Sequence, residues 1–82
     1  MSDTPTPLAF LGQGDSAKIV SIDLSADWRH RLAEMGLVVG ELITAKQVKR
    51  GSLIIEHKDS QWVLGRSLTS LIQVSPIGGR KG

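Results

Sequence analysis

The clearest amphipathic pattern in the chain follows Ser25. Trp28, Leu32 and Met35 are apolar and stand at i, i+4 and i+7, which puts them on one face of a helix. Ser25 is a suitable N-cap because its hydroxyl can accept a hydrogen bond from the first helical turn, and Asp27 there suits the helix dipole. The pattern predicts a helix that begins after Ser25, ends at about Met35 and packs Trp28 on the core.

Shorter apolar and β-branched stretches, separated by glycine or polar turns, occupy most of the remaining chain. In the stretch after Gly40, Ile43 and Ala45 lie on one side of an extended strand, and Thr44 and Lys46 lie on the other. Similar patterns predict strands at residues 17–22, 41–48, 53–57, 61–64 and 71–74, with a short helical turn at residues 68–70. Five short strands joined by tight turns favour a mainly β fold, a small barrel with one inserted short helix.

Two glycines after the predicted helix define how the chain leaves it. Gly36 can adopt the left-handed conformation that ends a helix. It would then be C′ of a Schellman motif in which Leu32 and Leu37 make the hydrophobic contact. Gly40 suits the third position of a type II turn, where φ must be positive. The sequence therefore predicts a helix stop, a reversal and entry into a strand.

The same residues resemble a known family. The motif Arg-Leu-x-x-Met-Gly-Leu-x-x-Gly at residues 31–40 is followed by Leu-Ile at 42–43, Leu-Gly-Arg at 64–66 and Leu-Ile-Gln-Val at 71–74. This pattern resembles the FeoA family, and the resemblance runs from about Leu8 to Val74. Two features depart from it: Val39 stands where a proline is common, and the hairpin at residues 49–52 lacks the Gly-Asp-Pro of many members.

The resemblance implies an SH3-like five-stranded barrel and a role in bacterial ferrous iron uptake. Its members are small cytoplasmic proteins, and the implied partner is the membrane-embedded ferrous iron permease with its GTPase domain. The same domain is also appended to metal-dependent transcriptional repressors, so a regulatory SH3-like domain of that type is the alternative. Against it, 82 residues leave no room for a helix-turn-helix domain beside the barrel.

Length and composition indicate a single domain with short tails. We predict flexible tails at residues 1–7 and 77–82, where prolines or glycines concentrate, and an SH3-like domain at residues 8–76. No apolar run approaches the ~18–20 residues of a membrane-spanning helix, so no direct membrane insertion is expected. The start of the chain lacks the basic and apolar regions of a secretory signal, which predicts a cytoplasmic location.

The sequence shows no arrangement of residues that predicts catalysis or a cofactor. Gly12 and Gly14 lack the further glycine and the helix of a dinucleotide loop, and no Gly-Lys-Ser/Thr occurs. No serine lies in a nucleophile-elbow motif. The net charge of +2 comes from scattered residues, and aromatic residues make up 4% of the chain, which disfavours a nucleic-acid-binding barrel. We therefore expect a protein without enzymatic activity.

Metal ligands are few. There is no cysteine, and the two histidines are His30 and His57. His30 and Glu34 stand at i, i+4 and could share one helix face. A specific ferrous site normally needs at least three protein ligands, and nothing in the sequence brings His57 to His30. No metal site is predicted.

The most distinctive surface is the charged helix face beside the glycine turn. Glycine lets another molecule approach the backbone there, which suits a docking surface. Trp62 has two interpretations, a core or helix contact and an outward anchor for a partner. The candidate partner-binding residues are Arg29, Arg31, Glu34, Met35, Gly36 and Trp62. The sequence leaves the oligomeric state open.

Overall fold

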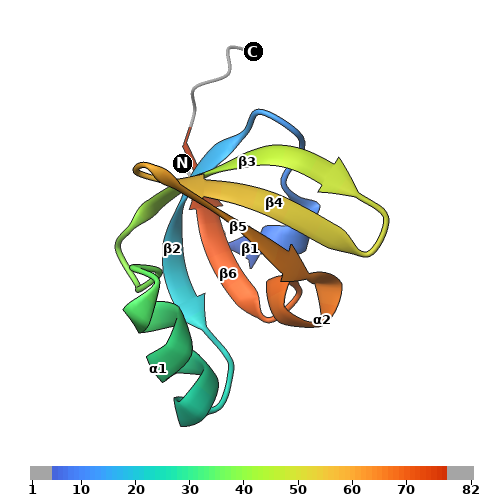
Figure 1. Ribbon diagram of the computed structural model, residues 1–82. Coiled ribbons are helices and arrows are strands. Elements are labelled where there is room, and N and C mark those ends of the chain that lie inside the picture. Colours follow the sequence, from blue (N-terminus) through green and yellow to red (C-terminus); the bar gives the residue numbers. More distant parts are fainter. Residues whose placement is uncertain (1–4, 78–82) are drawn as a thin grey trace.

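The chain forms one curled antiparallel sheet with a helix projecting from one end, as a computed structural model shows for residues 5–77 (Figure 1). The strand order in the sheet is β1-β6-β2-β3-β4-β5. In chain order the elements are β1 (Thr6–Pro7), the 3-10 helix η1 (Leu8–Phe10), β2 (Ser16–Ile22), α1 (Ala26–Glu34), β3 (Leu42–Lys49), β4 (Ser52–His57), β5 (Ser60–Gly65), α2 (Arg66–Thr69) and β6 (Ile72–Pro76).

All five predicted strands, the inserted helix and the short helical turn are present, with ends that differ by one or two residues. The number of strands differs from the prediction. A sixth strand, β1, lies in the predicted N-terminal tail and pairs Thr6 with Val74 and Pro7 with Gln73. At the other end, Ile77 N–H donates to Ser16 O at 2.9 Å. The rest of both predicted tails, residues 1–4 and 78–82, lies outside the described residues.

The sheet curls without closing into a complete barrel. Within residues 5–77, β1 and β5 are its two end strands, and no pairing joins them. Register shifts between Ile19 and Ser21 in β2 and between Ala45 and Gln47 in β3 mark irregularities of the β-bulge type. Such bulges bend a strand and increase its twist, which lets a short sheet wrap around its own core.

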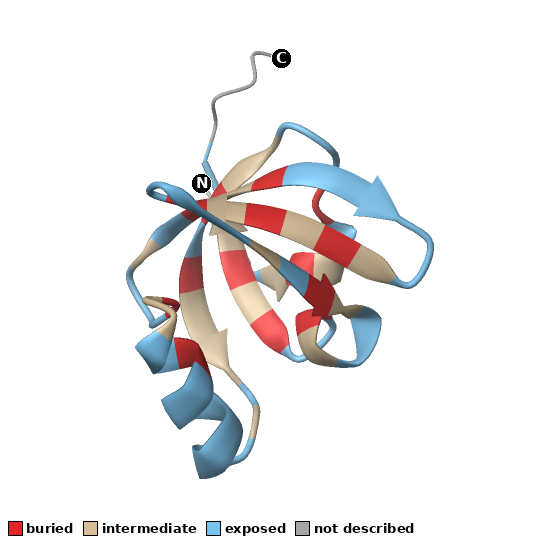
Figure 2. Ribbon diagram, viewed as in Figure 1, coloured by how far each residue is buried: buried red, intermediate tan, exposed pale blue. Residues whose placement is uncertain are grey.

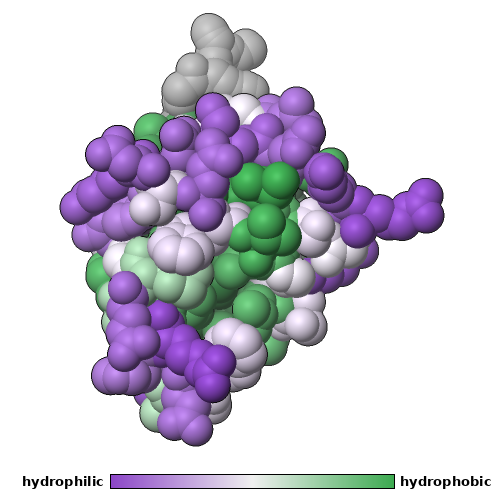
Figure 3. All heavy atoms as spheres, in the orientation of Figure 1, coloured by the Kyte–Doolittle hydropathy of each residue, from purple (hydrophilic) through white to green (hydrophobic). Residues whose placement is uncertain are grey.

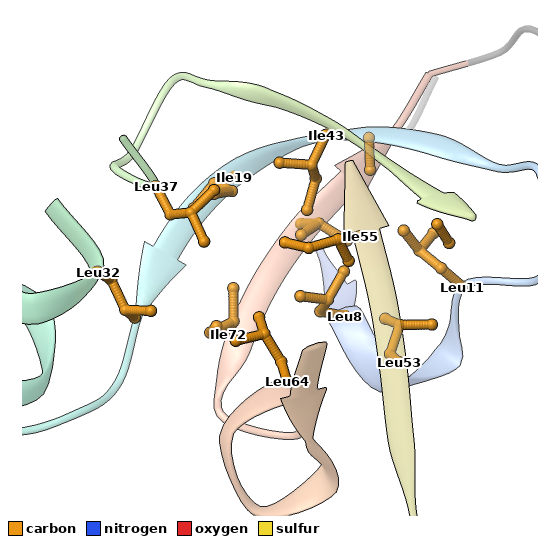
Figure 4. Packing of buried hydrophobic residues seen from close by; sticks show 13 residues of the cluster. Leu8, Leu11, Ile19, Leu32, Leu37, Ile43, Leu53, Ile55, Leu64 and Ile72 are labelled. Atoms are coloured by element: carbon orange, nitrogen blue, oxygen red, sulfur yellow. The ribbon is translucent and has the colours of Figure 1, made fainter. Parts of the chain in front are cut away.

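The core lies inside the curl and follows the strand alternation. Ile43 and Ala45 of β3 are buried as predicted, and in β4 Leu53, Ile55 and His57 alternate with half-buried residues. Each large aliphatic side chain buried in this way contributes about 1.5–3 kcal/mol of hydrophobic stabilisation. Figure 4 shows the cluster, in which Leu8 and Leu11 from the start of the chain, Leu32 and Leu37 from around the helix stop, and Ile19, Ile43, Leu53, Ile55, Leu64 and Ile72 meet.

Candidate functional site

The end of α1 is a Schellman motif. Leu37 N–H donates to Leu32 O at 2.8 Å, and Gly36 N–H donates to Ala33 O at 2.9 Å. These are the two bonds that define the motif when Gly36 is C′. Gly36 has a φ of 89°, and both leucines are buried in the core. The predicted helix stop is confirmed, and both leucines of the predicted pair belong to the buried core cluster.

The turn that follows is fixed to the neighbouring strand. Glu41 N–H donates to Val38 O at 3.1 Å, and Gly40 has a φ of 99°, as predicted for a type II turn. Gly40 N–H also donates to Ile19 O at 2.8 Å, and Ile19 N–H donates to Glu41 O at 3.0 Å. These two bonds tie the turn to β2. The backbone next to the helix stop is therefore held in a defined position.

A histidine from a distant strand packs directly under the helix stop. The ring of His57, at the end of β4, fills the space beside Gly36: a Cβ at Gly36 would lie 2.8 Å from its Cε1 and 3.1 Å from its Nδ1. His57 Nε2 donates to Glu41 Oε1 at 2.7 Å. The His57 side chain is 8% exposed and that of Glu41 is 34% exposed.

The bond from His57 also shapes the titration of Glu41. It stabilises the carboxylate and so holds the pKa of Glu41 below its ordinary value of 4.5, and Lys58 contributes in the same direction. Sequence reasoning missed this contact because residues 36, 41 and 57 are brought together only by the sheet. The one local signal was the position of His57 on the core-facing side of β4.

The outer face of α1 is open to solvent (Figure 2). Arg29, Arg31 and Glu34 are exposed. The prediction that Trp28 packs on the core is wrong: Trp28 is 40% exposed, and the Arg31 guanidinium lies 5.3 Å from the centroid of its ring. The N-terminal part of α1 projects beyond the sheet, so of the three residues in the predicted stripe only Leu32 is fully buried and Met35 is partly buried.

Trp62, the remaining candidate, comes from a different element. It lies in β5 opposite Ile55, is half-buried and packs against the core, while Val63 beside it faces outward and is 67% exposed. Its indole Nε1 is buried and has no hydrogen-bond partner within the described part of the chain. The structure thus gathers five of the six candidate residues around the helix stop and places Trp62 in β5 as a core contact.

The two histidines are held in separate pairs. His30 Nε2 lies 3.3 Å from Glu34 Oε2 on the exposed helix face, with side chains 76% and 68% exposed. His57 is paired with Glu41. Across residues 5–77, no group of three or more His, Cys, Asp or Glu side chains is placed to hold a metal ion. None of the helices described there has the length and apolar character needed to cross a membrane.

Comparison with known proteins gives consistent results. The FeoA domain model matches residues 6–76. A candidate Fe(2+) transport protein A of Methanocaldococcus jannaschii is 32% identical over 68 residues, which cover 83% of each chain. The crystal structure of an iron uptake regulatory protein (FeoA) is similar with a TM-score of 0.83 and 25% identity, over 90% of this chain and 100% of the other. A manganese-dependent transcriptional repressor matches with a TM-score of 0.82 and 15% identity, over 94% of this chain and 44% of its own.

These similarities first define a class: a small, mainly β, SH3-like domain, as predicted. The repressor contributes to that statement through its fold alone, because its identity to this chain is only 15%. The family follows from the sequence match. Since the family model covers residues 6–76, nearly the whole described chain, the chain belongs to the FeoA domain family.

Proposed function

We propose that this chain is a non-enzymatic accessory protein of ferrous iron uptake that works by protein–protein contact. Its partner is the membrane-embedded ferrous iron permease with its GTPase domain, which the chain meets on the cytoplasmic side. Membership of the FeoA domain family supports this, as does the relative named as an Fe(2+) transport protein A. Iron is the cargo of the permease in this proposal, and the chain needs no cofactor.

The observation that carries the proposal is the backbone hydrogen bonding around one surface at the end of α1, which we call the helix–turn surface: Arg29, Arg31, Glu34, Met35 and Gly36. The Schellman motif fixes the backbone at the helix stop, and two bonds to Ile19 fix the turn after it at Gly40 and Glu41, so little backbone ordering entropy remains to be lost when a partner binds. Arg31 stacks on the exposed ring of Trp28. Arginine and tryptophan are the residue types that most often dominate binding energy at interfaces.

The test is binding of the full-length permease in detergent, with and without nucleotide, to the tagged protein and its Arg31→Glu variant. We expect the substitution to weaken binding by about tenfold or more, as loss of a hot-spot contact does. The fold should survive because Arg31 is exposed and its ring contact is within the same helix. Far-UV circular dichroism should therefore stay unchanged, and any loss of stability should stay below about 1 kcal/mol, the cost expected for the exposed contact with Trp28.

Lys18→Glu is the control, a reversal of charge at an exposed position of β2 that belongs to neither proposed binding surface. It should leave permease binding unaffected. Normal binding by Arg31→Glu would place the contact elsewhere, with the surface beside Trp62 as the next candidate. If the unmodified protein binds no form of the permease, the transport role itself is wrong.

The alternative function is a regulatory domain like that of metal-dependent repressors. Only the similarity of fold supports it. The matching repressor is 15% identical, and this chain spans 44% of its length. That role predicts activity only when the domain is joined to a DNA-binding domain. Permease binding by the isolated chain, lost in Arg31→Glu, would decide against it.

A further inference from the structure

The outer edge of β5 is open for pairing. β5 is the last strand in the sheet order, and its six residues pair with β4 from His57–Ser60 to Ser52–Gly65 with no register shift. Within residues 5–77, no strand pairs with its other side. The opposite end of the sheet is different: β1 has only two residues, and one of them is Pro7. One sheet edge is thus short and interrupted, and the other is long and regular.

Natural sheets usually protect an open edge with charge, proline, a bulge or shortness. β5 has none of these, since its sequence is Ser-Gln-Trp-Val-Leu-Gly and its pairing to β4 is regular. Val63, at its middle, is 67% exposed. Figure 3 shows hydrophobic residues gathered over the middle of β5 and the adjoining part of β6, with hydrophilic residues around them. This edge has the backbone and the apolar side chains that an added strand needs.

Three cations lie at the carboxyl end of the same strand. Lys49 and Arg50 of the β3–β4 hairpin and Arg66 at the start of α2 line one hollow of about 280 Å³. Arg66 N–H donates to Gly51 O at 3.0 Å, which ties α2 to the hairpin. All three cations are exposed, and within the described chain none of them belongs to a salt bridge. We call these three residues the basic hollow.

We propose that the edge of β5 binds an extended segment of a partner protein as an additional antiparallel strand, whose amino-terminal end is acidic and binds in the basic hollow. The direction follows from geometry: a strand antiparallel to β5 has its amino-terminal end beside Gly65 and Arg66. Antiparallel pairing is slightly the more stable kind, and all five strand pairs among the described residues are antiparallel. Main-chain bonds supply affinity, and the acidic end fixes register and direction.

The basic hollow is separate from the helix–turn surface, and the proposal does not depend on the identity of the permease as partner. In Figure 1 the β3–β4 hairpin and α2 lie on the side of the molecule away from α1. Loss of binding at one surface can therefore be distinguished from loss at the other. The chain could bind a folded partner through α1 and an extended acidic segment through β5 at the same time.

The first experiment uses a synthetic probe, the acetylated and amidated peptide Asp-Asp-Glu-Thr-Val-Thr-Val-Thr-Val. The matched control is the same peptide in reverse order, with the acidic residues at the carboxyl end. We expect the forward peptide to bind about tenfold more tightly and to slow hydrogen exchange at alternate amides of β5, measured by NMR. Equal binding of both peptides, or protection outside β5, would overturn the proposal.

Substitutions then separate the strand from the charges. Val63→Lys places a charge on the edge and should abolish the protection of β5, whereas Leu42→Lys, at an exposed apolar position inside the sheet, should not. Arg50→Glu should weaken peptide binding and reduce its salt dependence, whereas Lys18→Glu on β2 should do neither.

Two other occupants are outcomes of the same measurements. If inorganic triphosphate competes with the peptide while the peptide never protects β5, the hollow is an anion site and strand addition is wrong. If sedimentation shows a dimer that Val63→Lys disrupts and that excludes the peptide, the occupant is a second copy of this chain. That result would overturn the proposed partner.

Discussion

Gly36 meets two demands at one position. Its φ of 89° is strained for any residue with a Cβ, and the His57 ring occupies the space that a Cβ would need, at 2.8 Å. Glu41 holds that ring in place. Gly40 has a φ of 99° and meets only the first demand, because nothing lies within 4 Å of its would-be Cβ. The two glycines of the motif are thus constrained for different reasons.

We predict that Gly36→Ala lowers the free energy of unfolding by more than ~2 kcal/mol and Gly40→Ala by about 1 kcal/mol. Both variants strain the backbone, and only the first collides with His57. Urea unfolding followed by circular dichroism measures both values. In a His57→Ala background the difference between the two variants should shrink. If the two substitutions cost the same in the unmodified protein, the His57 ring does not restrict Gly36.

At the scale of elements, α1 illustrates what a hydrophobic pattern can and cannot predict. The pattern correctly gave the helix, its N-cap and its stop, since Trp28 N–H donates to Ser25 Oγ at 3.3 Å and Gly36 ends the helix. It did not give the length over which the helix touches the sheet. Leu32 is buried, but Trp28 lies one turn further out, where the helix has left the core.

The other elements also differ in whether local sequence could predict them. Strands β2 to β6 were predictable because alternation and turn residues are local signals. β1 was not, since a two-residue strand that contains Pro7 has no periodicity and exists only through its pairing with β6. The same limit hid the contact of His57 with Gly36 and Glu41, because register across the sheet, which no local pattern encodes, brings these residues together.

This difference along α1 predicts unequal costs for two truncations. Leu32→Ala should destabilise the domain by about 2–5 kcal/mol, because it opens a cavity in the core. Trp28→Ala should cost less than about 1 kcal/mol, mainly the exposed contact with Arg31. Thermal or urea unfolding of the two variants checks this order. A Trp28→Ala variant as unstable as Leu32→Ala would mean that the helix packs along its whole length.

At the scale of the whole molecule, the small net charge conceals surfaces of different character. The helix–turn surface carries both signs, with Arg29 and Arg31 beside Glu34, whereas the basic hollow is lined by cations and no carboxylate within the described residues. The molecule as a whole therefore attracts a charged partner only weakly over long range. Attraction of an anionic partner is concentrated at the basic hollow. An SH3-like sheet of this size can in this way present two chemically distinct faces on one core.

The Glu41–His57 pair connects the turn before β3 to the end of β4, so its titration should be visible in the stability of the entire domain. Folding holds the pKa of Glu41 below 4.5, so at acid pH the unfolded chain binds a proton there more readily than the folded chain does. The stabilisation is fully present above the unfolded pKa and is lost as the pH falls through the lower folded pKa.

We therefore expect the free energy of unfolding to fall as the pH drops from about 5 into the acid range, and to fall less steeply in Glu41→Gln, which removes the titrating group. The slope of the free energy of unfolding against pH is the quantity to compare. The absolute stability is not suitable, because the amide also makes a weaker bond to His57 and so shifts it. Glu34→Gln is the matched control, the same substitution at an exposed carboxylate of α1. Urea unfolding across this range measures all three proteins. If the slope of Glu41→Gln equals that of the unmodified protein, the bond from His57 does not stabilise the Glu41 carboxylate, and the ring must be held under Gly36 by packing alone.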